Sequence, residues 1–220
     1  MPRAKTRRLH VISWSYFHGL ADFEVENLDV LLATSRALHP PDASYGVGAL
    51  YPPPGRRGFP DYPERPRVVI GGRRKGPPPS DIELFHSYWL ISGRLKSLFD
   101  SLDPQAFAFQ ACHVTLRDGA PGPEHWLCDV VRVIEAFDEL TRQKLRTNRN
   151  RFPALRNARV LMFDEAAIDT ARFFRTPQWI SDVFCDQGVK DACKAAGMKG
   201  LRFADCTPKR RRQGRKSMPD

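Results

Sequence analysis

The sequence predicts an α+β fold with a mixed or antiparallel sheet. The main observations are two strand–helix–strand units in the C-terminal half and a proline-rich N-terminal region. With 220 residues, of which 41% are apolar, the chain can bury a sizeable core. We expect a strand and helix region with a proline-rich loop over residues 1–80, an α+β domain over 81–207, and a basic flexible tail over 208–220.

The N-terminal region begins with two regular segments. Residues 9–15 alternate apolar and polar side chains, which is typical of a strand. Residues 23–38 place leucines on one helical face, with Asp22 or Asn27 available as the N-cap and Pro40 close behind the helix end. The sequence therefore predicts a strand followed by one amphipathic helix.

A proline-rich segment follows over residues 42–66. It can form neither a regular helix nor a β-ladder, because proline supplies no N–H and fixes φ. We expect a loop laid over the surface or a linker. Residues 67–71 then predict a short strand, and the turn-rich residues 71–80 are the best candidate for a domain boundary.

The first strand–helix–strand unit gives the C-terminal half its frame. Residues 88–91 are a short apolar strand, and Ser92 is an N-cap type that fixes where the helix begins. The helix runs from Gly93 to about Leu102 with one apolar stripe, and Pro104 stops it. A second strand covers residues 107–112.

The same pattern returns near the C-terminus. Residues 91–112 align without a gap on residues 185–206, which places Ser92 on Asp186, another N-cap residue type. Identities are few, so chance remains an alternative explanation of the similarity, because any two capped helices that each precede a strand share this pattern. Between the units, residues 126–137, 159–164 and 168–174 predict strands, with a tight turn at 164–167.

Charge and cysteine content narrow the functional class. The net charge of +10 favours an acidic partner, either nucleic acid or an acidic protein surface. The five cysteines form no CxxC pair and predict free thiols in a reducing compartment. We expect a cytoplasmic protein, since neither a secretory signal nor a membrane-spanning run is present.

The sequence offers no convincing reactive site. Cys112, His113, His125 and Cys128 flank one turn and are of zinc-binding types, but neighbouring strand residues, and residues three apart, point to opposite faces. We therefore predict no metal site. The chain also lacks a GxSxG elbow, a P-loop and a GxGxxG motif, so we expect no catalytic residue, no cofactor and no enzyme activity.

Nucleic-acid binding is the alternative function. Its candidate residues form a basic run near the C-terminus: Lys209, Arg210, Arg211, Arg212, Arg215 and Lys216. Such a run attracts phosphates, but no aromatic residue is interleaved to stack on bases. A solvated tail is the favoured interpretation.

Four segments in order resemble a known family. They are residues 88–102, 126–138, 168–175 and 183–206, the last of which contains Gly200-Leu201-Arg202-Phe203. Over roughly residues 80–206 they resemble immunity-protein family eleven of bacterial polymorphic toxin systems, earlier described as a domain of unknown function. In that family a strand-to-helix start recurs, followed by a strand with an aspartate and by a closing helix and strand.

The resemblance implies a non-catalytic, antitoxin-like protein. Such a protein binds a cognate toxin in the producing cell and blocks it. A basic antidote suits a toxin with an acidic surface, because complementary charge accelerates encounter. The sequence predicts no membrane contact and leaves the oligomeric state and the contact residues open.

Overall fold

The computed structural model describes residues 7–14, 21–39, 48–71, 76–139, 141–143 and 161–206. Its strands are β1 (Leu9–Trp14), β2 (Phe23–Val25), β3 (Arg67–Ile70), β4 (Ile82–Phe85), β5 (Tyr88–Ser92), β6 (Phe107–Ala111), β7 (His113–Leu116), β8 (His125–Val130), β9 (Phe173–Thr176), β10 (Trp179–Asp186) and β11 (Leu201–Asp205). Its helices include α1 (Leu28–Ala37), α2 (Gly93–Leu102), α4 (Glu165–Ile168) and α5 (Gln187–Ala195), and a 3₁₀ turn lies at Pro104–Ala106.

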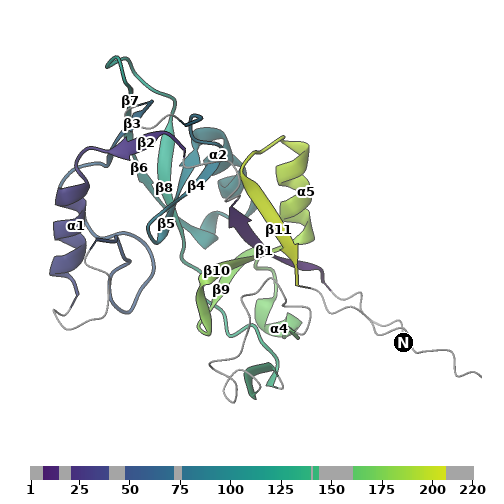
Figure 1. The fold of residues 1–220 in the computed structure, drawn as a ribbon. Coiled ribbons are helices and arrows are strands. Elements are labelled where there is room, and N and C mark those ends of the chain that lie inside the picture. Colours follow the sequence, from purple (N-terminus) through teal and green to yellow (C-terminus); the bar gives the residue numbers. More distant parts are fainter. Residues whose placement is uncertain are drawn as a thin grey trace, which may run out of the picture.

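The strands form three sheets, and the predicted α+β class is confirmed. The orders are β4-β5-β8-β6, β11-β1-β10-β9 and β2-β3-β7. The first two sheets are antiparallel, and the third is mixed because β3 pairs with β7 in parallel. Figure 1 shows α1 on one side of the β4-β5-β8-β6 sheet and α5 on the other. The expected division near residue 80 stays a prediction.

The unit β5–α2–β6 forms where the sequence predicts it. The Ser92 hydroxyl accepts a hydrogen bond from the Leu95 amide at 3.3 Å, which caps the first turn of α2. All four residues from Tyr88 to Ile91 are buried, because both faces of β5 are covered. Ile91 packs into the core shared with α2, whereas Leu90 packs against the β2-β3-β7 sheet.

The unit β10–α5–β11 repeats this arrangement. The Asp186 carboxylate accepts a hydrogen bond from the Val189 amide at 2.8 Å, so Asp186 caps α5 as Ser92 caps α2. The first residue of α5 and both ends of β11 lie 94 positions after their counterparts in α2 and β6. The predicted second unit is therefore confirmed.

In both units a third strand lies between the two strands of the unit, but this third strand comes from a different part of the chain in each case. β8 lies between β5 and β6, and β1 lies between β10 and β11. The registers agree: Trp89 lies opposite Cys128, and the equivalent Val183 lies opposite Ile12. The middle strand of the second sheet thus comes from the N-terminal part of the chain. This agreement favours a repeated architecture over chance similarity.

One hydrophobic core joins the units. Leu95 and Phe99 of α2 pack in the same cluster as Val189 and Cys193 of α5. The ring of Phe99 lies 4.9 Å from the ring of Phe173 on β9, so a side chain of the first unit packs directly on the sheet that contains the second unit.

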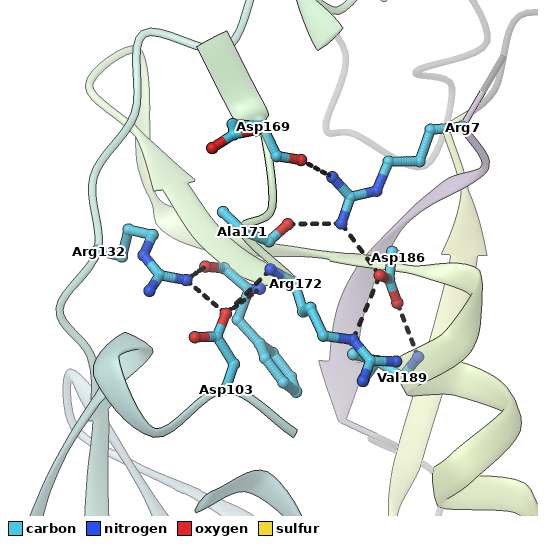
Figure 2. A network of polar contacts seen from close by, with 9 residues as sticks. Arg7, Asp103, Arg132, Asp169, Ala171, Arg172, Asp186 and Val189 are labelled. Atoms are coloured by element: carbon cyan, nitrogen blue, oxygen red, sulfur yellow. Dashed lines mark hydrogen bonds and ion pairs between the residues drawn. The ribbon is translucent and has the colours of Figure 1, made fainter. Parts of the chain in front are cut away.

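Two aspartates connect the units at the edge of this core (Figure 2). Asp103, after α2, pairs with Arg132 and accepts the backbone amide of Arg172 at 2.9 Å. Asp186 pairs with Arg7 at 3.0 Å and with the side chain of Arg172 at 3.4 Å. Arg172 therefore bonds to one carboxylate through its backbone and to the other through its guanidinium group.

The predicted helix over residues 23–38 was wrong at its start. Phe23–Val25 forms β2, because pairing with β3 overrides the helical pattern. Asn27 stands at the N-cap position of α1, but its side chain donates to the Arg65 carbonyl and accepts from the Arg67 amide. It holds the start of β3 instead of the first turn of α1.

Three predictions between the two units also need correction. The turn over residues 164–167 is the helix α4, capped by the Asp164 side chain. The strand predicted over 168–174 is shorter and later, because Ile168 ends α4 and β9 begins at Phe173. The strand predicted over 126–137 ends at Val130. Part of the strand predicted over 159–164 lies outside the described residues.

Candidate functional site

A cleft of about 1090 Å³ opens beside the β4–β5 hairpin. Five segments line it: the end of the α1 region, the proline loop, the hairpin, the segment after β8, and β9 with the start of β10. The lining residues are His39, Tyr51, Pro52, Pro53, Pro54, Gly55, Arg56, Arg57, Leu84, His86, Ser87, Trp89, Val131, Val133, Arg175, Ile180 and Ser181.

The proline loop forms one wall of the cleft and is anchored at both ends. The Ser35 hydroxyl of α1 accepts the Tyr51 amide at 3.1 Å and lies 3.3 Å from the Tyr51 carbonyl oxygen, to which it donates. At the other end, the Tyr88 hydroxyl donates to the Gly58 carbonyl at 3.2 Å. The expected surface loop is thus held by side-chain hydrogen bonds where proline precludes a backbone ladder.

Two arginines stand at the tip of this loop. Gly55 and Gly58 flank Arg56 and Arg57 and have φ values of 75° and 106°. Only glycine adopts this region without strain, so the loop can turn tightly around the two cations. Arg56 is exposed, whereas the Arg57 side chain is 13% exposed.

A buried carboxylate lies behind the cleft. Asp129 of β8 is fully buried and pairs with Arg57 and, at 3.2 Å, with Arg175. Its second oxygen accepts the Gly58 amide at 2.8 Å. A buried charge requires such partners, because an isolated one is very costly to desolvate. Asp129 therefore ties the proline loop, β8 and β9 together.

Arg175 forms the base of the cleft. Its side chain is 4% exposed and donates to the carbonyls of Val130 at 3.0 Å and Ile180 at 2.7 Å, in addition to Asp129. Burial and the neighbouring Arg57 lower the pKa of Arg175 to about 10. The guanidinium group therefore stays charged at neutral pH.

The rim of the cleft carries exposed apolar side chains. Leu84, Val133 and Ile180 are each 40–41% exposed. They are three of the five large hydrophobic residues that are exposed in the described part of the chain. Large apolar side chains clustered at one surface indicate an interaction site more than the same residues scattered singly.

The residues that the sequence singled out lie elsewhere. The six basic candidates of the nucleic-acid alternative, Lys209 to Lys216, lie outside the described residues. Among the zinc-type residues, Cys128 is buried in the apolar core and His113 is exposed. Within the described ranges, His, Cys, Asp and Glu side chains form no group of three that would hold a metal ion.

Sequence inspection missed the ion-paired site behind the cleft. Arg57, Asp129 and Arg175 are far apart in the chain, so no local spacing connects them. One signal was available: Asp129 interrupts an apolar strand, and a charged residue at a buried strand position requires a partner. The partner itself was not identifiable from that signal.

The profile of the immunity protein family (Imm11) matches residues 18–208. This chain belongs to that family. The Imm11 match confirms the resemblance noted over residues 80–206 and extends it toward the N-terminus, so that every residue lining the cleft falls inside it. A search of curated proteins found no match. In the described part of this Imm11 protein, no helix has the length and apolar character required to cross a membrane.

Proposed function

We propose that this chain is an immunity protein that binds a cognate protein toxin and neutralises it without chemistry of its own. The observation that carries the proposal is the Imm11 match, which spans most of the chain. We further propose that it acts in the cytoplasm of the producing bacterium, within a polymorphic toxin system.

The cleft supports a binding role rather than a reactive one. Its charged lining consists of hydrogen-bond donors, namely Arg56, Arg57 and Arg175. The carboxylate that pairs with two of these arginines, Asp129, is fully buried and already accepts from two guanidinium groups and one amide. A general base must reach its substrate, and Asp129 is shielded by its own partners.

The overall charge supports our proposal that the surface of the toxin is acidic. A net charge of +10 attracts an acidic partner over a distance comparable with the Debye length, about 8 Å at physiological ionic strength. The main effect is expected on the association rate, so raising the salt concentration should slow binding more than it speeds dissociation.

Co-expression with the product of the neighbouring gene tests the proposal. We expect the two proteins to co-purify and the immunity protein to protect a host cell from that product. Protection should require a stoichiometric amount, because a non-catalytic inhibitor is consumed as it binds. Absence of both binding and protection would overturn the proposal, and protection at a small fraction of the toxin concentration would indicate an enzyme instead.

A further inference from the structure

The geometry points to the cleft beside the β4–β5 hairpin as the surface that binds the toxin. We propose that its occupant is a toxin segment in which a carboxylate contacts Arg56 and Arg57 and flanking apolar side chains contact Leu84, Val133 and Ile180. This inference rests on the proposed function and adds to it the location of the interface and the chemistry of the partner.

Charge is the first argument for this occupant. The residues that line the cleft include three arginines and no aspartate or glutamate. Arg57 and Arg175 both pair with Asp129, and Arg175 also interacts electrostatically with Asp182. No carboxylate of the described residues forms an ion pair with Arg56. The cleft therefore retains positive charge that a partner carboxylate would neutralise.

The two loop arginines are the ones available to the partner. Arg175 has its Nε and both terminal nitrogens engaged by Val130, Ile180 and Asp129. Arg57 uses one terminal nitrogen on Asp129, and its side chain is still 13% exposed. Arg56 is exposed beside it. A carboxylate is a good match, because guanidinium groups bind it through two parallel hydrogen bonds.

The apolar rim is the second argument and favours a polypeptide. Leu84, Val133 and Ile180 line the same cleft as the arginines and are partly exposed, and Tyr51 and Trp89 also line it. Arginine, tyrosine and tryptophan are the residue types that contribute most to binding at protein interfaces. Nucleic acid would require several unpaired cations spaced along a groove. Burial lowers the pKa of His86, so this imidazole adds no charge at neutral pH.

A set of four variants tests the inference against the full-length product of the neighbouring gene. The cleft variants are Arg56→Glu and Ile180→Ser. Each has a matched control outside the cleft: Arg117→Glu, an exposed arginine in the turn after β7, and Met162→Ser, which removes an apolar side chain that is 48% exposed. All four side chains are exposed or partly exposed, so we expect folded proteins, to be checked by thermal melting.

We expect each cleft variant to weaken binding by about tenfold or more, and each control to change it by less than about threefold. If wild type binds and protects but the cleft variants bind as tightly as their controls, the inference is wrong and the proposed function stands. If the wild-type protein itself does not bind, the proposed function is wrong, and the inference that rests on it is wrong as well. Equal losses in Arg56→Glu and Arg117→Glu would also overturn the inference, because only net charge would matter.

A second measurement identifies the occupant. Overlapping peptides that cover the neighbouring gene product are tested for binding to wild type and to Arg56→Glu. We expect binding peptides to contain an aspartate or glutamate between apolar residues and to lose affinity for Arg56→Glu. Exchange of that acidic residue for arginine in the toxin should restore binding to Arg56→Glu. Binding confined to basic peptides, or cleft-dependent binding of a single-stranded oligonucleotide instead, would overturn the inference.

Discussion

Replacing Asp129 with asparagine should destabilise the fold more than any exposed charge change. Asparagine keeps the shape of the side chain and can still accept the Gly58 amide. It removes the negative charge from Arg57 and from Arg175, whose side chain is 4% exposed. Arg175 then remains as a buried cation with only carbonyl partners.

The size of the effect follows from the geometry. At the 3.2 Å separation between Arg175 and Asp129, Coulomb's law with an effective dielectric constant of about 20 gives an attraction of about 5 kcal/mol. Removing one partner of a buried pair typically destabilises a protein by about 3–5 kcal/mol. For a chain of this length each kcal/mol corresponds to about 2–4 °C, so the melting temperature should fall by about 6–20 °C.

Urea unfolding and thermal melting of Asp129→Asn measure this effect. The matched control is Glu64→Gln, which removes the partner of Arg67 in an exposed ion pair and should change stability by less than about 1 kcal/mol. Combining Asp129→Asn with Arg175→Met should cost less than the sum of the single changes, because the two residues interact directly. The reasoning is refuted if Asp129→Asn melts within a degree or two of Glu64→Gln.

Three further predictions concern the two repeated units. Ser92→Ala should destabilise by about 1–2 kcal/mol in urea unfolding, because it removes both the α2 cap and the hydrogen bond that the hydroxyl donates to Asp81. Ser97→Ala, on the exposed face of the same helix, should be close to neutral; equal effects would contradict the role of Ser92. Gly200→Ala should cost about 2–3 kcal/mol, because φ is 86° and a Cβ would lie 2.9 Å from the Ile82 carbonyl oxygen. Gly119→Ala, with a similar φ and open space around it, should cost about half as much; equal costs would show that backbone strain alone matters and that the contact with Ile82 does not. Burial raises the pKa of Asp81, but hydrogen bonds from Arg94, Ser92 and the Lys199 amide outweigh it and lower the pKa overall. The contribution of Asp81 to the free energy of unfolding is therefore complete above the unfolded pKa of about 3.9 and is lost as pH falls further. Asp81→Asn should flatten the loss of unfolding free energy below that pH, and an unchanged slope would contradict this.

The first repeated unit was predictable because its signals are local. Ser92 marks a helix start, leucines at helical spacing mark the buried stripe, and Pro104 marks the end. Each signal depends on residues within a few positions of one another, and α2 has the predicted bounds. The alignment of residues 91–112 on 185–206 then located α5 and β11 without further information.

Pairing between distant segments was not predictable in the same way. Phe23–Val25 has a helical pattern but forms β2, because β3 lies beside it in space. Nothing near residues 9–14 indicates that β1 belongs between β10 and β11. The cleft was not predictable for the same reason. Arg57 lies in a loop that has no periodic pattern, its partner Asp129 comes from β8, and Arg175, the second arginine that pairs with Asp129, comes from β9.

The position of β1 has a consequence for how the protein is made. This strand leaves the ribosome before most of the chain, yet both of its hydrogen-bonded neighbours, β10 and β11, are synthesised near the end of the described chain. The nascent chain therefore carries a strand with two open edges until β10 and β11 have been made, a condition that chaperones relieve in other proteins. The second sheet of this Imm11 protein therefore closes only once β10 and β11 have both been made, although β1 is present long before.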